Sequence, residues 1–259
     1  MRYPGRTSKR PYKKRAYRRR RAAPKKKQSF AARVNKLIHA QIENKLVSTY
    51  AANQNMNYAG PATSPSYINL TPSPSYGANQ NQRLANEIRI MKAHIRGYVN
   101  LSAYNATFNP GTSPVYVKMW LCRRKQTNIA ITGNPAGTDW SNFFQSGGSS
   151  VGFQANILDM CFKTNNDYWT VLATKTFQLA SNAVVTSAGI YGASSRVSRP
   201  FSFTFGKHLA KIKYNDATTY PTNKELFLVM QAVAADGTSP SAAQYCEYHY
   251  NVEWEFEDA

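Results

Sequence analysis

The amino-acid sequence predicts an all-β fold: a single eight-stranded antiparallel sandwich of the jelly-roll type, preceded by a disordered basic arm. Three observations lead to this prediction. Apolar residues alternate with polar ones over many short segments, no long segments of helical periodicity separate them, and positive charge gathers at the N-terminus. A chain of 259 residues is long enough for one large β domain and a tail.

The N-terminal segment carries most of the excess charge. The net charge is +20, and the first 36 residues hold 16 of the 33 Lys and Arg residues but no acidic residue, since Glu43 is the first. Like charges at this density repel one another, and little aliphatic surface is present to offset the ordering entropy. We therefore expect residues 1–29 to be a disordered arm that a polyanion meets first.

The arm has the residue types of a nucleic-acid binder that does not read sequence. Lys and Arg neutralise phosphates and release counterions, and Arg and Tyr can stack on bases. Lys13-Lys14-Arg15 with Lys25-Lys26-Lys27 also resembles a bipartite nuclear localisation signal, which leaves a purely targeting or solubilising tail as the alternative. The residues predicted to bind nucleic acid are Arg2, Arg6, Lys9, Arg10, Lys13, Lys14, Arg15, Arg18, Arg19, Arg20, Arg21, Lys25, Lys26 and Lys27.

Residues 30–42 form the link to the predicted domain at 43–259. Apolar residues recur there at three- and four-residue steps, which indicates a short helix or an extended linker. Residues 43–50 are the first predicted strand. A polar, Pro-rich excursion over 58–82 follows, with a short extended piece at 67–70.

The middle of the chain shows two clear strands. Ile88 and Ile90 alternate on even positions, whereas Ile95 and Val99 alternate on odd ones, and this phase change predicts a β-bulge or a sharp bend between them. Apolar residues at odd positions over 115–121 predict a half-buried strand.

The remaining segments differ in their periodicity. Residues 138–166 contain several glycines and little alternation, which indicates a long loop with a helical turn at 140–144. Strands are predicted from alternation or continuous apolarity over 168–179, 201–205, 226–233 and 248–256. The almost continuously apolar segment 226–233 indicates a core strand, with burial against a neighbouring subunit as the alternative.

Two weaker basic groups lie within the predicted domain. Lys207, Lys211 and Lys213 fall on one face of a predicted strand, and Arg123-Arg124-Lys125 ends another. These residues form a possible secondary basic surface for nucleic acid. A solvated strand face or a subunit contact is the alternative interpretation.

The sequence offers few features of a metal site or an enzyme. Acidic residues and His249 share one face of the last predicted strand and could bind Ca²⁺ at a subunit boundary, although pairing with a neighbour's basic residues needs no metal. No phosphate loop, metal-binding cysteine pair or nucleophile elbow is present, so we expect no catalytic residues, no other cofactor and no enzymatic activity. The odd count of three cysteines indicates reduced thiols, and no apolar run is long enough to span a membrane.

Several stretches, in their order along the chain, resemble the capsid proteins of circular, replication-initiator-encoding single-stranded DNA viruses, the circovirus-like group. They are the basic arm, Glu43-Asn44-Lys45, the run from Gln82 to Ile88, the run Tyr168-Trp169-Thr170-Val171-Leu172, and the Tyr-rich acidic last strand. The chain departs from the group at Ala85, where glycine is more usual, and in its relatively short arm.

The resemblance implies a capsid protein that packages a single-stranded genome, DNA favoured over RNA, inside a small icosahedral T=1 shell of about 60 identical subunits. The implied location is the virion, and the host nucleus during assembly. Host nuclear import machinery and a cell receptor are further expected partners, without membrane insertion. Two alternatives remain open: a movement or nuclear shuttle protein that binds nucleic acid without forming a shell, and the coat protein of a satellite-like RNA virus.

Overall fold

The structure is a computed structural model that describes residues 44–56, 64–101, 114–125, 134–135, 137–179, 184–186, 189–191, 198–215, 220–235 and 246–258. Residues Ile42–Ala259 form one compact unit. The predicted arm and the predicted helix or linker at 30–42 lie outside the described residues, so both stay predictions. Within the described residues the fold is all-β and the paired strands of both main sheets are antiparallel, which confirms the predicted class.

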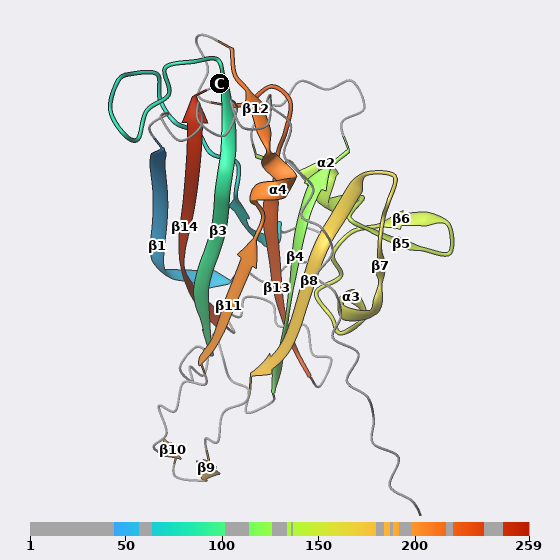
Figure 1. Cartoon of the computed structure of the whole chain (residues 1–259). Helices are drawn as coiled ribbons and strands as arrows, with labels where there is room; N and C mark the ends of the chain where they lie inside the picture. Colours follow the sequence, from blue (N-terminus) through green and yellow to red (C-terminus); the bar gives the residue numbers. More distant parts are fainter. Residues whose placement is uncertain are drawn as a thin grey trace, which may run out of the picture. The chain divides into compact units, whose positions relative to one another are not determined.

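Two sheets pack face to face (Figure 1). The first has the order β1-β14-β3-β11, with β12 also paired to β3, and the second has the order β2-β13-β4-β8. The strands of the first sheet are β1 (Lys45–Met56), β14 (Cys246–Asp258), β3 (Glu87–Leu101), β11 (Ser198–Thr204) and β12 (Lys211–Lys213). Those of the second are β2 (Ser66–Asn69), β13 (Phe227–Ala234), β4 (Val115–Arg124) and β8 (Trp169–Leu179).

The space between the sheets holds the main hydrophobic core, here called the inter-sheet core. It is built by alternation, because every second residue of a strand points to the same face. In β3, for example, Ile95 and Val99 are buried while Arg96 and Tyr98 are exposed. Strand β4 supplies Val117 and Met119 from the opposite sheet. These two residues belong to the same buried cluster as Ile95 and Val99.

The predicted phase change in β3 is a β-bulge at Met91. Lys92 lies opposite Glu255 and Ile90 lies opposite Phe256, so Met91 is the extra residue in the β3–β14 pairing. The bulge explains why the buried positions switch from even to odd numbers along one strand. This prediction is therefore confirmed. Strand β1 is longer than expected, since it continues to Met56 through an irregularity between Ala51 and Gln54.

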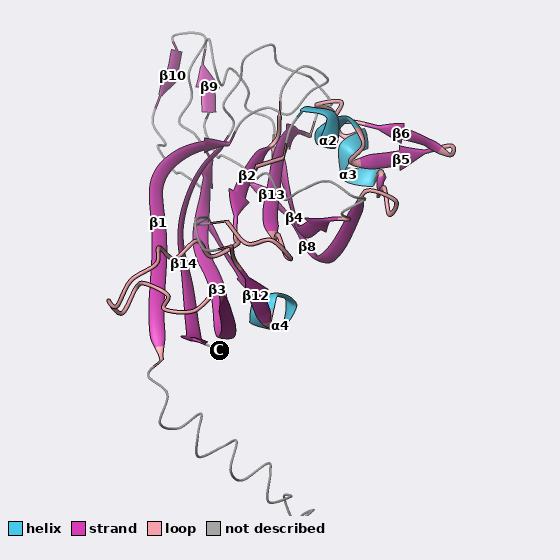
Figure 2. Cartoon of the chain, turned by 90° about the horizontal axis from the view of Figure 1, so that it is seen from above, coloured by secondary structure: helices cyan, strands magenta, loops and turns pink. Residues whose placement is uncertain are grey.

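The segment at 138–166, predicted as a long loop with a helical turn at 140–144, has a helix near that turn, at Gly137–Ser141, but the prediction of a loop for the rest is wrong. It forms α2 (Gly137–Ser141), β5 (Phe144–Ser146), β6 (Ser149–Val151), α3 (Leu158–Cys161) and β7 (Lys163–Thr164). Figure 2 shows this group lying on the side of the second sheet that faces away from the first sheet. Each element has only two to five residues, which is too short for periodicity to appear in the sequence.

This inserted group covers the outer face of the second sheet with a second cluster, here called the aromatic layer. Its buried members are Trp120, Cys122, Trp140, Phe143, Phe144, Phe153, Trp169, Phe227 and Val229. Trp120 is thus buried, although alternation placed it on the solvated face of a half-buried strand. The continuously apolar β13 is buried along its whole length, because one face lies in each cluster. The prediction of a core strand is confirmed.

Two stretches that carry the family resemblance hold buried charges. Lys45 of β1 donates to the carbonyl oxygen of Gln82 at 2.9 Å and pairs with Asp258 at 2.6 Å. Arg83 is 1% exposed, donates to the carbonyl oxygens of Ala85 and Asn215, and its guanidinium lies 4.6 Å from the ring centroid of Tyr214. These residues tie the 76–86 segment to one end of the first sheet, through Lys45 of β1 and through Tyr214, which follows β12.

The remaining described elements are a hairpin and a short helix. Strands β9 (Val184–Thr186) and β10 (Gly189–Tyr191) pair with each other. Helix α4 (Gly206–Leu209) connects β11 to β12 and lies against β3. The prediction that Lys207, Lys211 and Lys213 share one strand is wrong, because Lys207 belongs to α4.

Candidate nucleic-acid interface

The fourteen predicted nucleic-acid-binding residues of the arm lie outside the described residues. The secondary basic surface is described in full. The structure separates it into three places: the end of β4 with Arg123, Arg124 and Lys125, helix α4 with Lys207, and strand β12 with Lys211 and Lys213.

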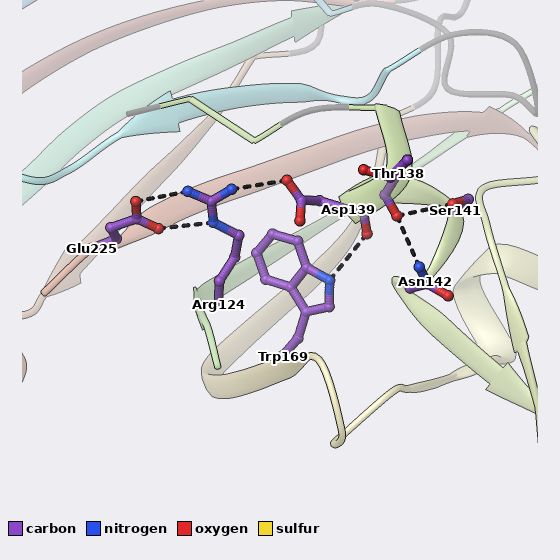
Figure 3. Close-up of polar contacts among 7 residues, drawn as sticks. All are labelled: Arg124, Thr138, Asp139, Ser141, Asn142, Trp169 and Glu225. Atoms are coloured by element: carbon purple, nitrogen blue, oxygen red, sulfur yellow. Dashed lines mark hydrogen bonds and ion pairs between the residues drawn. The ribbon is translucent and has the colours of Figure 1, made fainter. Parts of the chain in front are cut away.

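The half-buried Arg124 is held by two carboxylates (Figure 3). Its Nε and Nη2 donate to the two carboxylate oxygens of Glu225 at 2.8 and 2.7 Å, and its Nη1 donates to Oδ2 of Asp139 at 2.8 Å. This fork-to-fork geometry is the strong form of an Arg–carboxylate contact. Trp169 adds a weaker link, because its Nε1 donates to the carbonyl oxygen of Asp139 at 3.3 Å.

The charge of Arg124 is therefore balanced internally. Burial acts to lower the pKa of Arg124, but the hydrogen bonds and negative charges of Glu225 and Asp139 outweigh burial, and the pKa is raised. Asp139 lies in α2, so this ion pair also ties the inserted group to the end of β4. The sequence places Arg124 in a basic run that could bind a polyanion, but its guanidinium is already paired with Glu225 and Asp139.

Lys211 and Lys213 flank Ile212 on β12 and both approach Glu87 of β3. Lys211 forms a short ion pair with Glu87, and Nζ of Lys213 lies 4.0 Å from the other oxygen of that carboxylate. The hydrogen bond from Lys211 is the main reason that the pKa of Glu87 is lowered. Both lysine side chains are more than 60% exposed, so they are accessible to a partner. Glu87 is the acid near both of them.

Helix α4 interrupts the expected strand at a point where the chain passes close to β3. A Cβ at Gly206 would lie 2.9 Å from the backbone nitrogen of Ala93, so the chain passes β3 more closely than another residue allows. The helix ends at Ala210, which has a φ of 39°. Lys207 therefore lies in α4 and is not part of the strand that carries Lys211 and Lys213.

The fold brings Arg123 and Lys125 next to two residues that sequence patterns did not single out. His208 of α4 and Lys224, which precedes Glu225, line one pocket of about 480 Å³ together with Arg123, Arg124 and Lys125. Lys224 is isolated from other basic residues in the sequence, and His208 follows Lys207 alone. No local signal could have placed either residue beside the end of β4.

Two acids on the outer face of β14 pair with side chains of β3. Glu253 lies 2.8 Å from His94, and Glu255 lies 2.7 Å from Lys92. Among the described residues, no group of three or more His, Cys, Asp and Glu side chains is arranged to hold a metal ion. Calcium at a subunit boundary therefore stays a prediction without support from this arrangement.

Comparison with known protein families and with curated proteins finds no match to this chain. No helix in the described part of the chain is long and apolar enough to cross a membrane.

Proposed function

We propose that this chain is a viral capsid protein that packages a single-stranded genome, DNA favoured over RNA. The observation that carries the proposal is the separation of charge along the chain: 16 basic and no acidic residues in the first 36, followed by 17 basic and 13 acidic residues in the rest. A dense basic arm neutralises phosphates without reading bases, as packaging of a whole genome requires. About 60 such arms would bring on the order of 1,000 positive charges inside a shell.

We further propose that the sandwich is an eight-stranded jelly roll. The supporting observation is the pairing order of the eight strands β1, β2, β3, β4, β8, β11, β13 and β14. The first pairs with the last, the second with the seventh, the third with the sixth, and the fourth with the fifth. This is the order that results when one long hairpin is rolled into two sheets, and it is typical of shell-forming capsid domains.

The inserted group also fits a structural role. It covers the outer face of the second sheet, so the apolar side chains that β4 and β13 place on that face are buried and do not form an exposed apolar patch. The charged and polar outer face of the first sheet, including Lys92, His94, Glu253 and Glu255, is suited to solvent or to a second subunit. The proposal gives the protein no catalytic role.

Assembly separates this function from that of a free nucleic-acid-binding protein. The full chain is expressed, the lysate is treated with nuclease, and pelletable material is examined by negative-stain microscopy and by its ultraviolet absorbance ratio. Uniform particles that contain protected nucleic acid are the expected result. Soluble monomers or dimers across salt and pH would overturn the capsid proposal and favour a movement or nuclear shuttle protein. Identification of the protected strand as RNA would favour the satellite-like alternative.

The contribution of the arm is tested by the salt dependence of oligothymidylate binding. For single strands, the slope of log K against log salt is about −0.7 for each neutralised phosphate. Deletion of residues 1–28 is expected to flatten the slope, because it removes fourteen cations. A slope equal to that of the full chain would show that the arm is not the main binding element.

A further inference from the structure

The pocket at the end of β4 gathers basic side chains from three separate segments. Arg123 and Lys125 come from the end of β4, His208 comes from α4, and Lys224 comes from the segment before β13. Asp167, from the turn before β8, and Thr170, from β8 itself, also line the pocket. The volume of about 480 Å³ leaves room for a group larger than a single water or ion.

The charges in this pocket do not balance. Of its two acids, Glu225 is bound on both oxygens by Arg124, so it offers little to the other cations. Asp167 is the remaining acid, beside the three permanent cations Arg123, Lys125 and Lys224. None of these three makes an ion pair within the part of the chain that the structure describes.

Hydrogen bonds hold the Lys224 side chain and the backbone at Lys125 in place beside the pocket. Lys224 donates from Nζ to the carbonyl oxygen of Leu209 at 2.7 Å, which leaves two of its three ammonium protons for another acceptor. The backbone N–H of Lys125 donates to the carbonyl oxygen of Tyr168 at 2.7 Å, which fixes the end of β4 against the turn before β8. A side chain held in this way, as Lys224 is, loses less entropy when an anion binds than a mobile surface lysine loses.

We propose that this pocket binds the phosphate of a nucleotide. Arg123 supplies a planar fork that matches two phosphate oxygens, and Lys125 and Lys224 supply point charges from two sides. Tyr168, which is 47% exposed, lies beside the rim and can offer a ring face on which a base stacks. The same chemistry serves a free nucleotide and one unit of a strand.

Two titratable groups are affected by the excess of positive charge around the pocket. Burial lowers the pKa of His208, and the charges of Lys207 and Arg123 lower it further. Burial also lowers the pKa of Lys224, with Arg123 again adding to the effect. A bound phosphate would oppose both effects by placing negative charge among these cations.

The test reads the pocket separately from the arm. The full chain is labelled with acetic anhydride in chloride, in inorganic phosphate, in thymidine monophosphate and in oligothymidylate at matched ionic strength, and acetylation is quantified by mass spectrometry. Lys125 and Lys224 are expected to become several-fold less reactive in at least one of the three phosphate-containing conditions. Lys92 is the control lysine in the same sample. Its side chain is 70% exposed, and it pairs with Glu255 within the first sheet, whereas Arg123 and Lys125 lie at the end of a strand of the second sheet.

Variants connect the protection to the pocket. Arg123→Gln is expected to raise the concentration needed for protection about tenfold, which is the loss of one charge-assisted hydrogen bond. Arg123→Lys should keep part of the affinity, and Lys92→Gln, with the same change in charge, should keep all of it. Far-ultraviolet circular dichroism shows whether each variant is folded, and Arg123 is exposed, so its replacement is not expected to alter the fold.

The outcomes are distinct. Protection by thymidine monophosphate alone indicates a free nucleotide, and protection by oligothymidylate indicates a strand; both support the proposal. Equal reactivity in chloride and in every phosphate-containing condition, equal protection of Lys92, or unchanged protection in Arg123→Gln would overturn it. The assay reads single lysines and does not depend on assembly. If the chain formed no particles but Lys125 and Lys224 were still protected, the capsid proposal would be overturned and the proposal for the pocket would stand.

Discussion

The inter-sheet core and the aromatic layer bury the two faces of the same sheet by different means. On β13, Leu228 points into the inter-sheet core and its neighbour Phe227 points into the aromatic layer, and both are fully buried. The inter-sheet core is closed by a second long sheet, whereas the aromatic layer is closed by elements of two to five residues. Large rings compensate for short elements, because each ring buries more surface than an aliphatic side chain.

The two clusters also differ in how their edges are fastened. The inserted group over the aromatic layer is attached by ionisable side chains. Arg124 binds Asp139 of α2, and the buried Asp159 of α3 accepts a hydrogen bond from Gln231 of β13 at 2.6 Å. We therefore expect the aromatic layer to respond to charge changes and to pH, and the inter-sheet core to respond mainly to changes in apolar volume.

The largest expected effect comes from truncating the adjacent residues of β13. Phe227→Ala should cost about 3–5 kcal/mol of unfolding free energy and Leu228→Ala about 2–5 kcal/mol, since both leave cavities. Because the inserted group needs the sheet as the floor of its aromatic layer, both variants should show one cooperative transition in urea. Tryptophan fluorescence and far-ultraviolet circular dichroism should report the same midpoint for each variant.

A different result would separate the two clusters. If Phe227→Ala produced an early fluorescence transition while circular dichroism kept the wild-type midpoint, the inserted group would unfold independently of the sandwich. The shared sheet would then not couple the two clusters.

A smaller loss is expected when the attachment at Arg124 is broken. Arg124→Gln leaves Glu225, whose side chain is 4% exposed, without its bidentate partner and should cost about 3 kcal/mol. Lys92→Gln removes an equal charge from an exposed pair with Glu255 and should cost less than about 1 kcal/mol. Urea unfolding measures both values. Equal losses would show that burial of Glu225 does not determine the effect.

The pH response of Asp159 is the smallest expected effect. Burial raises the pKa of Asp159 despite hydrogen bonds from Gln231 and from backbone N–H groups that act to lower it. A carboxyl whose folded pKa is raised contributes stability below its unfolded pKa of about 3.9 and loses that contribution as pH rises through the folded value. The unfolding free energy of wild type minus that of Asp159→Asn should therefore fall between acid and neutral pH. A difference that rises with pH would contradict this account.

The inter-sheet core could be predicted from sequence because long strands repeat one pattern many times. The Met91 bulge and the fully buried β13 were both visible in that pattern. The aromatic layer was not, because the rings of Trp140, Phe143 and Phe153 are unevenly spaced and meet only after folding. Trp120 illustrates the limit, since alternation identifies its face but not what covers that face.

The candidate sites show the same limit. Arg123 and Arg124 are neighbours in the sequence and have the same chemistry, yet only tertiary structure places Glu225 and Asp139 on Arg124. Lys224 and His208 reach the end of β4 through contacts between segments that are far apart along the chain. The charge of the arm, in contrast, needs no fold to be recognised, because it depends on composition alone.

The central claim is that the sandwich builds a closed shell around nucleic acid gathered by the arm. The most direct test is the mass of nuclease-treated particles from the full chain, measured by native mass spectrometry or mass photometry. About 60 chains of 29.0 kDa amount to about 1.7 MDa of protein, so a single narrow peak at or above that mass, with excess mass from protected nucleic acid, is the predicted result. A broad series of small oligomers without protected nucleic acid would contradict the account.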